Sequence, residues 1–160
     1  MPACAQLREI AAHNAPDYVF SLSRASAAAR HPRWREQIGS APSADEQAAA
    51  AVWVRGGRIR YVALTRDGAS DGAVKYDDYC YDRAGRLRYM REEYRSPAAN
   101  WIAIRERGWS AQGQANGEER HSLWLTNERP RPAPAGVVAP AAPVYARVGD
   151  LPFVALLPSS

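Results

Sequence analysis

Apolar and aromatic residues alternate with polar ones through the middle of the chain, between Ala51 and Arg95. A period of two is typical of strands that bury one face. Residues with strong turn preference interrupt the alternation three times. The breaks leave four predicted strands, at 52–55, 58–66, 73–82 and 86–95. We expect these strands to form an antiparallel meander.

Two further strands are predicted after this meander. Trp101 to Ile104 is apolar, and the segment 119–126 contains the apolar run Leu123-Trp124-Leu125. The polar, glycine-rich stretch from Gly108 to Gly117 is predicted to be a hairpin loop or an irregular excursion between them. The sheet is therefore expected to have about five or six strands.

Alternation also assigns the side chains of the third and fourth strands to two faces. In the third strand, one face carries Tyr76, Asp78 and Cys80, and the other carries Asp77, Tyr79 and Tyr81. In the fourth, the two sets are Leu87, Tyr89, Arg91 and Glu93, and Arg88, Met90, Glu92 and Tyr94. Both faces carry large side chains, so we expect helices or the C-terminal tail to cover the second face.

The first 50 residues are predicted to form a helical cover for the sheet. Apolar residues between Cys4 and Ala11 recur at helical spacing. The segment 18–30 fits either a short strand followed by a helix or a helix throughout. Ser43 and Glu46 have the spacing of a capping box, which predicts a short helix that runs towards the first strand.

The C-terminal part of the chain changes character twice. Residues 127–143 are rich in proline and alanine and have no periodicity, which is typical of an extended strap. Residues 144–160 become apolar again, and such a tail would be costly to leave in water. We therefore expect it to dock on the sheet. The sequence predicts a single α+β domain over 1–160, in which the meander occupies 51–126.

The composition is that of an ordinary globular protein, with 46% hydrophobic and 24% charged residues. No apolar run approaches the ~18 residues of a membrane helix, so no membrane span is expected. The net charge of +4 comes almost entirely from arginine, because Lys75 is the only lysine. Arginine pairs well with carboxylates, and a positive field steers anionic partners, so we expect a partner protein with an acidic surface.

Cys4 and Cys80 are the two cysteines of the chain. In a reducing compartment they would be buried thiols, and in an oxidising one they would pin the N-terminal helix to the meander. Small residues around Cys4 resemble the start of a processed exported protein, although the chain as given begins without a leader. We favour a disulfide and a periplasmic or secreted location, with a cytoplasmic location as the alternative.

The segment Tyr81-Asp82-Arg83-Ala84-Gly85-Arg86-Leu87 resembles the core of the YD repeats of bacterial Rhs-type surface and toxin proteins. In this motif the aspartate can accept hydrogen bonds from the turn backbone, and the glycine supplies a positive φ. The resemblance covers one turn, whereas those proteins stack many copies. A broader similarity is to small exported bacterial β-rich proteins of unassigned function. It implies a periplasmic or secreted domain and no particular activity.

The acidic residues of the meander are the first candidates for chemistry: Asp77, Asp78, Asp82, Glu92 and Glu93. Two carboxylates on one face could serve acid–base catalysis or bind Ca2+. Ion pairs with neighbouring arginines are the expected use, because Asp77 and Asp78 point to opposite faces. The histidines and cysteines show no metal-ligand spacing. The sequence therefore predicts no catalytic residue, no metal site and no cofactor.

Aromatic residues interleaved with arginine form a candidate binding surface, which comprises Trp53, Arg58, Arg60, Tyr61, Tyr79, Tyr81, Arg88 and Tyr89. Such residues are good strand formers, and they are also enriched at protein-binding surfaces. We expect a non-enzymatic exported module that binds another protein, in an accessory or immunity-type role. The first alternative is a protein that binds single-stranded nucleic acid through stacking and phosphate contacts. The second is a hydrolase with an unrecognised carboxylate site.

Overall fold

The computed structural model describes residues 2–37, 46–68 and 72–158. Within these residues the chain forms one antiparallel sheet in the order β2-β1-β3-β4-β5-β6-β7-β8. The strands are β1 (Tyr18–Ser23), β2 (Arg35–Glu36), β3 (Glu46–Arg55), β4 (Arg58–Asp67), β5 (Val74–Tyr81), β6 (Leu87–Ser96), β7 (Trp101–Trp109) and β8 (Ala115–Trp124). The helices are α1 (Pro2–His13), α2 (Arg24–Ala27) and two 3-10 turns, η1 (Val148–Asp150) and η2 (Val154–Leu156).

The antiparallel sheet is confirmed, but the predicted count of five or six strands is wrong, because the sheet has eight. The first 50 residues are also not simply a helical cover, since β1 and β2 extend the sheet beyond β3. The helix predicted after Ser43 is wrong from Glu46 onwards, where β3 begins, and Ser43 itself lies outside the described residues. Alanine favours helices, but here Ala48 and Ala50 pack into the sheet core.

The last two strands also differ from the prediction. β7 continues to Trp109 and β8 begins at Ala115, so a hairpin loop is present but is confined to residues 110–114, and the rest of the predicted 108–117 segment is strand. Residues 115–121 are exposed on both faces, so they carry no alternating pattern. A polar edge strand of this kind is hard to distinguish from a loop by composition.

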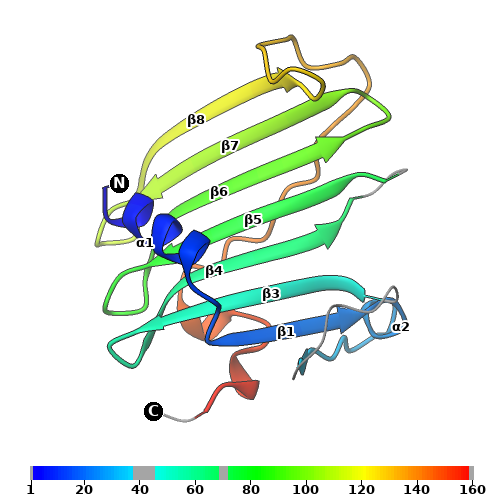
Figure 1. Cartoon of the computed structure of the whole chain (residues 1–160). Coiled ribbons are helices and arrows are strands. Elements are labelled where there is room, and N and C mark those ends of the chain that lie inside the picture. The colour runs from blue at the N-terminus through cyan, green and yellow to red at the C-terminus, as the bar shows by residue number, and fades with distance from the viewer. Residues whose placement is uncertain (1, 38–45, 69–71, 159–160) are drawn as a thin grey trace.

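One face of the sheet carries the main core, and the C-terminal segment covers it. Figure 1 shows this segment running behind the sheet from β8 back towards β3 and β1, while α1 crosses the front. Phe153 of the segment is fully buried and stacks on Phe20 of β1, with 4.8 Å between ring centroids. Leu151 packs in the same cluster. A sheet without a second sheet must bury its apolar face in this way.

Main-chain contacts hold this C-terminal segment in place. The hydroxyls of Tyr79 and Tyr81 donate hydrogen bonds to the carbonyl oxygens of Pro143 and Tyr145, at 2.9 and 3.0 Å. Both rings are almost wholly buried, and burial raises the pKa of both phenols. Two polar hydroxyls in an apolar core need such partners, so they fix where a proline-rich segment without regular structure can cross the sheet.

The hairpin that joins β5 to β6 has the turn chemistry expected from its sequence. An Asp82 carboxylate oxygen accepts from the backbone N–H groups of Ala84 and Arg86, at 2.9 and 3.0 Å. Gly85 has a φ of +75°, which L side chains rarely adopt. A register shift after Cys80 pairs Tyr81 with Leu87. The β-bulge turns Leu87 to the Tyr81 face, not to the Tyr89 face that simple alternation predicts.

On the other face, α1 is joined to the sheet by its first cysteine. The sulfur atoms of Cys4 and Cys80 lie at disulfide distance, with 5.9 Å between the Cα atoms. Tyr61 and Tyr89 flank the bond, and Leu7 and Ala11 of α1 pack beside them. Helix α1 covers only part of this face, across β4 to β6, as Figure 1 shows. The disulfide joins two residues that are 76 positions apart in the sequence, and so closes a long loop.

We predict that reduction of this disulfide lowers the free energy of unfolding by about 2–4 kcal/mol, because a long loop is released in the unfolded chain. Urea unfolding with and without dithiothreitol measures the change. A Cys4→Ser/Cys80→Ser variant is the control, since its stability should match that of the reduced protein and not respond to dithiothreitol. Equal stability of the oxidised and fully reduced protein would contradict the prediction, with the redox state checked by intact mass after alkylation.

Candidate functional site

The lysine of this chain lies at the centre of a buried ionic cluster beneath the C-terminal segment. Lys75 on β5 is 4% exposed, and its ammonium group donates to Asp77 at 2.8 Å and to Glu92 at 2.9 Å. Strand alternation places Lys75 and Asp77 on the same face as Tyr79, and the β5–β6 register brings Glu92 opposite Asp77. Two carboxylates therefore converge on one ammonium group.

The pKa values of the two carboxylates of this cluster are shifted in opposite directions. Burial raises the pKa of Asp77, and the pairing with Lys75 offsets only part of that effect. Burial also favours the neutral form of Glu92, but its pKa is lowered overall by the Ala142 N–H, by Lys75 and by Arg107. The Ala142 N–H belongs to the C-terminal segment and lies 2.8 Å from the Glu92 carboxylate. Glu92 thus links the charge cluster to the segment that covers it.

Ion pairs extend this cluster across five strands. Arg107 lies 3.1 Å from Glu92, Arg105 lies between Glu92 and Glu118, and Arg120 lies 3.3 Å from Glu118. Arg66 lies 3.9 Å from Asp77 on the other side. We call the connected set the strap-face ion network; its members are Arg66, Lys75, Asp77, Glu92, Arg105, Arg107, Glu118 and Arg120. It holds five cations and three carboxylates, an excess of two positive charges.

A cavity of about 380 Å³ adjoins this network, between the sheet and the strap. Its apolar wall includes Tyr94 and Trp101, whose rings meet edge to face with centroids 5.9 Å apart. The strap residues 137–141 lie across it. Its polar wall includes Lys75, Glu92, Arg105 and Arg120. The volume falls within the range of small-molecule sites, roughly 300–1,000 Å³.

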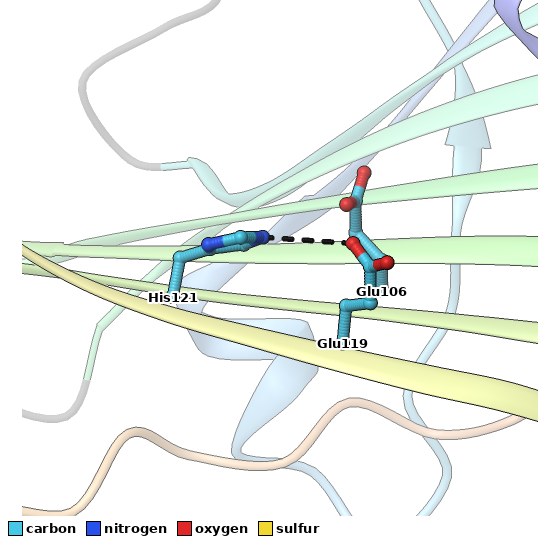
Figure 2. A group of neighbouring side chains, drawn as sticks. All are labelled: Glu106, Glu119 and His121. Carbon is cyan, nitrogen blue, oxygen red and sulfur yellow. Dashed lines mark ion pairs between the residues drawn. The ribbon is translucent and has the colours of Figure 1, made fainter.

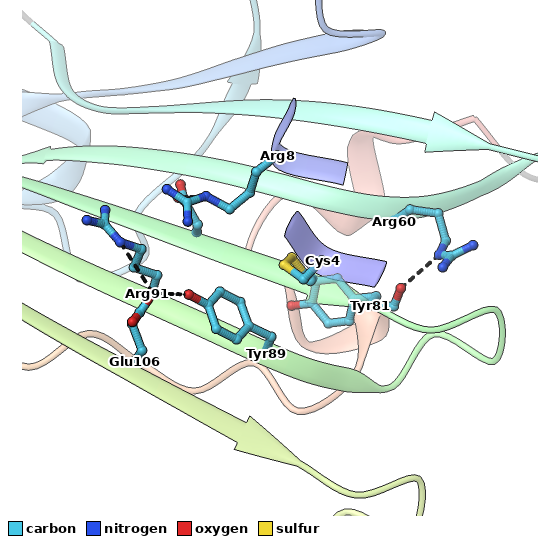
Figure 3. Close-up of a disulfide and its surroundings, with 9 residues drawn as sticks. Cys4, Arg8, Arg60, Tyr81, Tyr89, Arg91 and Glu106 are labelled. Atoms are coloured by element: carbon cyan, nitrogen blue, oxygen red, sulfur yellow. Dashed lines mark hydrogen bonds and ion pairs between the residues drawn. A yellow bond between two sulfur atoms is a disulfide. The ribbon is translucent and has the colours of Figure 1, made fainter. Parts of the chain in front are cut away.

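A second polar group surrounds the disulfide on the opposite face (Figure 3). Arg8 of α1 lies 3.6 Å from Asp78, and burial, with Asp78 close by, raises the pKa of Tyr61. The Tyr89 hydroxyl donates to Glu106, which also lies 3.6 Å from Arg91. These pairs are partly buried and connect α1 to β4, β5, β6 and β7. These contacts hold α1 and the disulfide against the sheet, which is a structural use.

Glu106, Glu119 and His121 form a group that could hold a divalent cation (Figure 2). One ligand atom of each lies within 4.8 Å of the others, and Glu119 faces Glu106 directly across the β7–β8 ladder. Like charges in opposed positions destabilise a sheet, and a bound cation would relieve that repulsion. His121 and Glu119 are exposed, and their atoms lie 3.7 Å apart. The sequence alone does not indicate this group, because its residues come from two strands whose register brings them together.

The outer edge of β8 is open over 115–121, where no described strand pairs with it. Further along, the Arg131 N–H donates to the Ser122 carbonyl at 2.9 Å, and the Trp124 N–H donates to the Arg129 carbonyl at 2.8 Å. Backbone groups alternate in direction along a strand. The N–H and carbonyl of Arg120 therefore also point away from β7, towards solvent.

The eight residues of the predicted binding surface do not form one surface. Tyr79 and Tyr81 lie beneath the C-terminal segment, whereas Trp53, Tyr61 and Tyr89 lie on the α1 face. Arg60 and Arg88 donate to the carbonyls of Tyr81 and Trp109, both at 2.8 Å. Arg58 is exposed at the β3–β4 turn.

The acidic candidates are also divided between the two faces. Asp77 and Glu92 meet at Lys75, while Asp78 and Glu93 lie on the α1 side of the sheet and pair with Arg8, Arg91 and Arg95. Asp82 serves the turn, where Arg86 and Arg88 lie 3.3 and 3.8 Å from its carboxylate. Arginine pairing was the expected use of these acids.

Lys75 is not among the predicted site residues, although its spacing in the sequence indicates its position. Lys75, Asp77 and Tyr79 are two residues apart, so a buried Tyr79 places a lysine and an aspartate on the same buried face. Arg105, Arg107 and Glu118 could not be added in this way. Their contacts depend on the register of β6, β7 and β8.

Comparisons with known proteins give no relative for this fold and these groups: no family model, curated protein or solved structure matches the chain. None of the described helices is long and apolar enough to span a membrane.

We predict that Glu92→Gln costs about 3 kcal/mol of stability at neutral pH, because the buried Lys75 loses one of its two carboxylates. A lowered folded-state pKa means that the Glu92 carboxylate stabilises the fold above the ordinary glutamate pKa of about 4.3. This contribution is lost as the pH falls through the lowered value. The difference between wild type and variant should therefore narrow in acid.

Urea unfolding between pH 7 and pH 3 measures this difference, with Glu128→Gln as the control. Glu128 pairs with Arg95 but is 66% exposed, so its loss should cost well under 1 kcal/mol. Similar losses in the two variants, or a difference that does not narrow in acid, would contradict a stabilising role for the Glu92 carboxylate.

Proposed function

We propose that this protein is an exported, non-enzymatic binding module that engages another protein through the open edge of β8. The observation that supports this most is the backbone of 115–121, with which no other strand of the described residues pairs, at the end of an eight-stranded antiparallel sheet. Such an edge can pair with an extended segment of a partner, which then continues the sheet. An accessory or immunity-type role is consistent with a module that acts by pairing.

The chain itself uses the same edge a few residues further on. Residues 129–131 fold back and form an antiparallel bridge with β8 at Leu123 and Pro130. The Arg131 guanidinium lies over the Trp124 ring, 3.9 Å from its centroid, and supports this contact. The edge therefore has the geometry to accept an added segment, and within the described part of the chain only its last residues are occupied.

The charged side chains on this edge favour pairing with particular partner strands over pairing with any extended segment. Glu118, Glu119 and Arg120 are exposed. Charged side chains on an edge strand discourage pairing with arbitrary segments, so a partner needs complementary charges. The net charge of +4 would favour the approach of an acidic partner protein.

The proposal of export rests on the cysteine pair. A disulfide that bonds the only two cysteines persists in oxidising compartments such as the periplasm or the extracellular space. Thiol labelling of the protein in its native cells, before and after reduction, tests this proposal independently of any binding partner.

The two alternative functions have less support. A nucleic-acid platform needs accessible aromatic rings and free arginines, but Tyr79 and Tyr81 are buried, and Arg60 donates to the backbone. A hydrolase needs two acids free to act on a substrate. Asp77 and Glu92 do converge, but Lys75 occupies the space between them.

We predict that Arg120→Pro weakens partner binding far more than Arg120→Gln does. Both variants lose the charged side chain, but only proline removes the outward N–H that a partner strand would use. That N–H does not serve the β7–β8 ladder, so the fold should survive. A photo-crosslinking residue at position 120 would identify the partner in native cells, and calorimetry with the purified partner would then compare the two variants.

Equal binding by Arg120→Pro and Arg120→Gln, with both folded by circular dichroism, would rule out pairing at this edge. Tight binding to a single-stranded oligonucleotide that falls steeply with salt would instead favour the nucleic-acid alternative.

A further inference from the structure

The cavity under the strap has two chemically different walls. Tyr94, Trp101 and Ala103 from β6 and β7 form one wall together with the strap residues Val137 and Ala139. These side chains are apolar, and Trp101 directs its indole N–H to the Ser122 hydroxyl at 2.8 Å. The wall therefore suits the apolar body of a ligand.

The other wall belongs to the strap-face ion network, which carries two more cations than carboxylates. Lys75 already uses two of its three N–H donors on carboxylates. Arg105 and Arg120 each have five N–H donors. Among the described residues they share the carboxylate of Glu118, and Arg105 also lies 3.9 Å from Glu92. Two guanidinium groups that line the cavity thus have fewer anionic partners than they can accommodate.

We propose that this cavity binds a small carboxylate with an apolar body, whose head group pairs with Arg105 and Arg120 and whose body packs on Tyr94 and Trp101. A carboxylate fits because guanidinium groups bind it through paired, charge-assisted hydrogen bonds. Its charge also reduces the local excess of positive charge. The site is independent of the main-chain edge proposed for the protein partner.

Calorimetry with decanoate, decan-1-ol and decylammonium tests the head group, because the three probes share one apolar chain. Decanoate should bind at least tenfold more tightly than decan-1-ol, and decylammonium should bind most weakly. An Arg105→Gln/Arg120→Gln variant should lose the preference for decanoate. Arg58→Gln/Arg83→Gln, which also removes two charges but at two exposed turns away from the cavity, is the charge-matched control and should keep it.

The position of the ligand is tested by a larger side chain on β7 that would fill the cavity. Ala103→Leu should weaken decanoate binding at least tenfold, whereas Ala98→Leu, in the exposed β6–β7 turn, should not. The indole N–H signals of the wild-type protein give a second readout that needs no variant. Decanoate should shift the signal of Trp101, and should leave that of Trp53, which donates to Asn14 on the opposite face, unchanged.

Equal affinity for decanoate and decan-1-ol would overturn the assignment of an anionic head group. An unshifted Trp101 signal at saturating decanoate would overturn the assignment of the cavity. Neither result would affect the proposed pairing at the β8 edge, which depends on the outward N–H of Arg120.

Discussion

The structure depends on one constraint: a single sheet has two faces, and each must be protected from water where it is apolar. The chain meets this requirement with its two ends. The N-terminal helix is fixed to one face by the Cys4–Cys80 pair, and the C-terminal segment crosses the other. Neither cover is large, so each needs specific contacts. The disulfide supplies one, and the hydroxyls of Tyr79 and Tyr81 supply the other.

Burial of charge beneath the C-terminal segment follows from the same arrangement. Moving ionised groups out of water is expensive, and a buried pair offsets that cost only with good geometry and further hydrogen bonds. Lys75, Asp77 and Glu92 meet this condition in part, since the Ala142 N–H completes Glu92. Among the described residues the second Asp77 oxygen has no hydrogen-bond partner, and the pKa of Asp77 is raised by burial. The contact with Ala142 also fixes the position of the strap on the sheet.

The sequence was most informative where large and small or polar and apolar residues alternate. The faces of β5 could be assigned from alternation, and the structure places Tyr79 and Tyr81 in one core cluster and Cys80 in the other. The same method failed at 48–51, where four alanines give no contrast between faces. It failed again at 115–121, where an edge strand is exposed on both sides.

The candidate sites were harder to predict than the strands. Pairing of Asp77 with a cation on its own face follows from a spacing of two residues. The meeting of Arg105 with Glu118, or of Glu106 with Glu119, depends on a register that no local pattern encodes. The cavity depends in addition on the path of residues 133–141, a segment whose composition predicts extension but not direction.

Different side chains cover the strap face near β3 and near β7, and this difference bears on where both proposed sites lie. Near β1 and β3, Phe153 and Leu151 fill the space above the sheet. Near β7, small strap residues such as Ala139 leave a cavity above Trp101. Beyond β8 the described chain provides no further strand over 115–121. A ligand in the cavity would contact side chains on one face of β8, whereas a partner strand would pair with its main chain. The same strand can therefore serve both, the ligand through its side chains and the partner strand through its main-chain N–H and carbonyl groups.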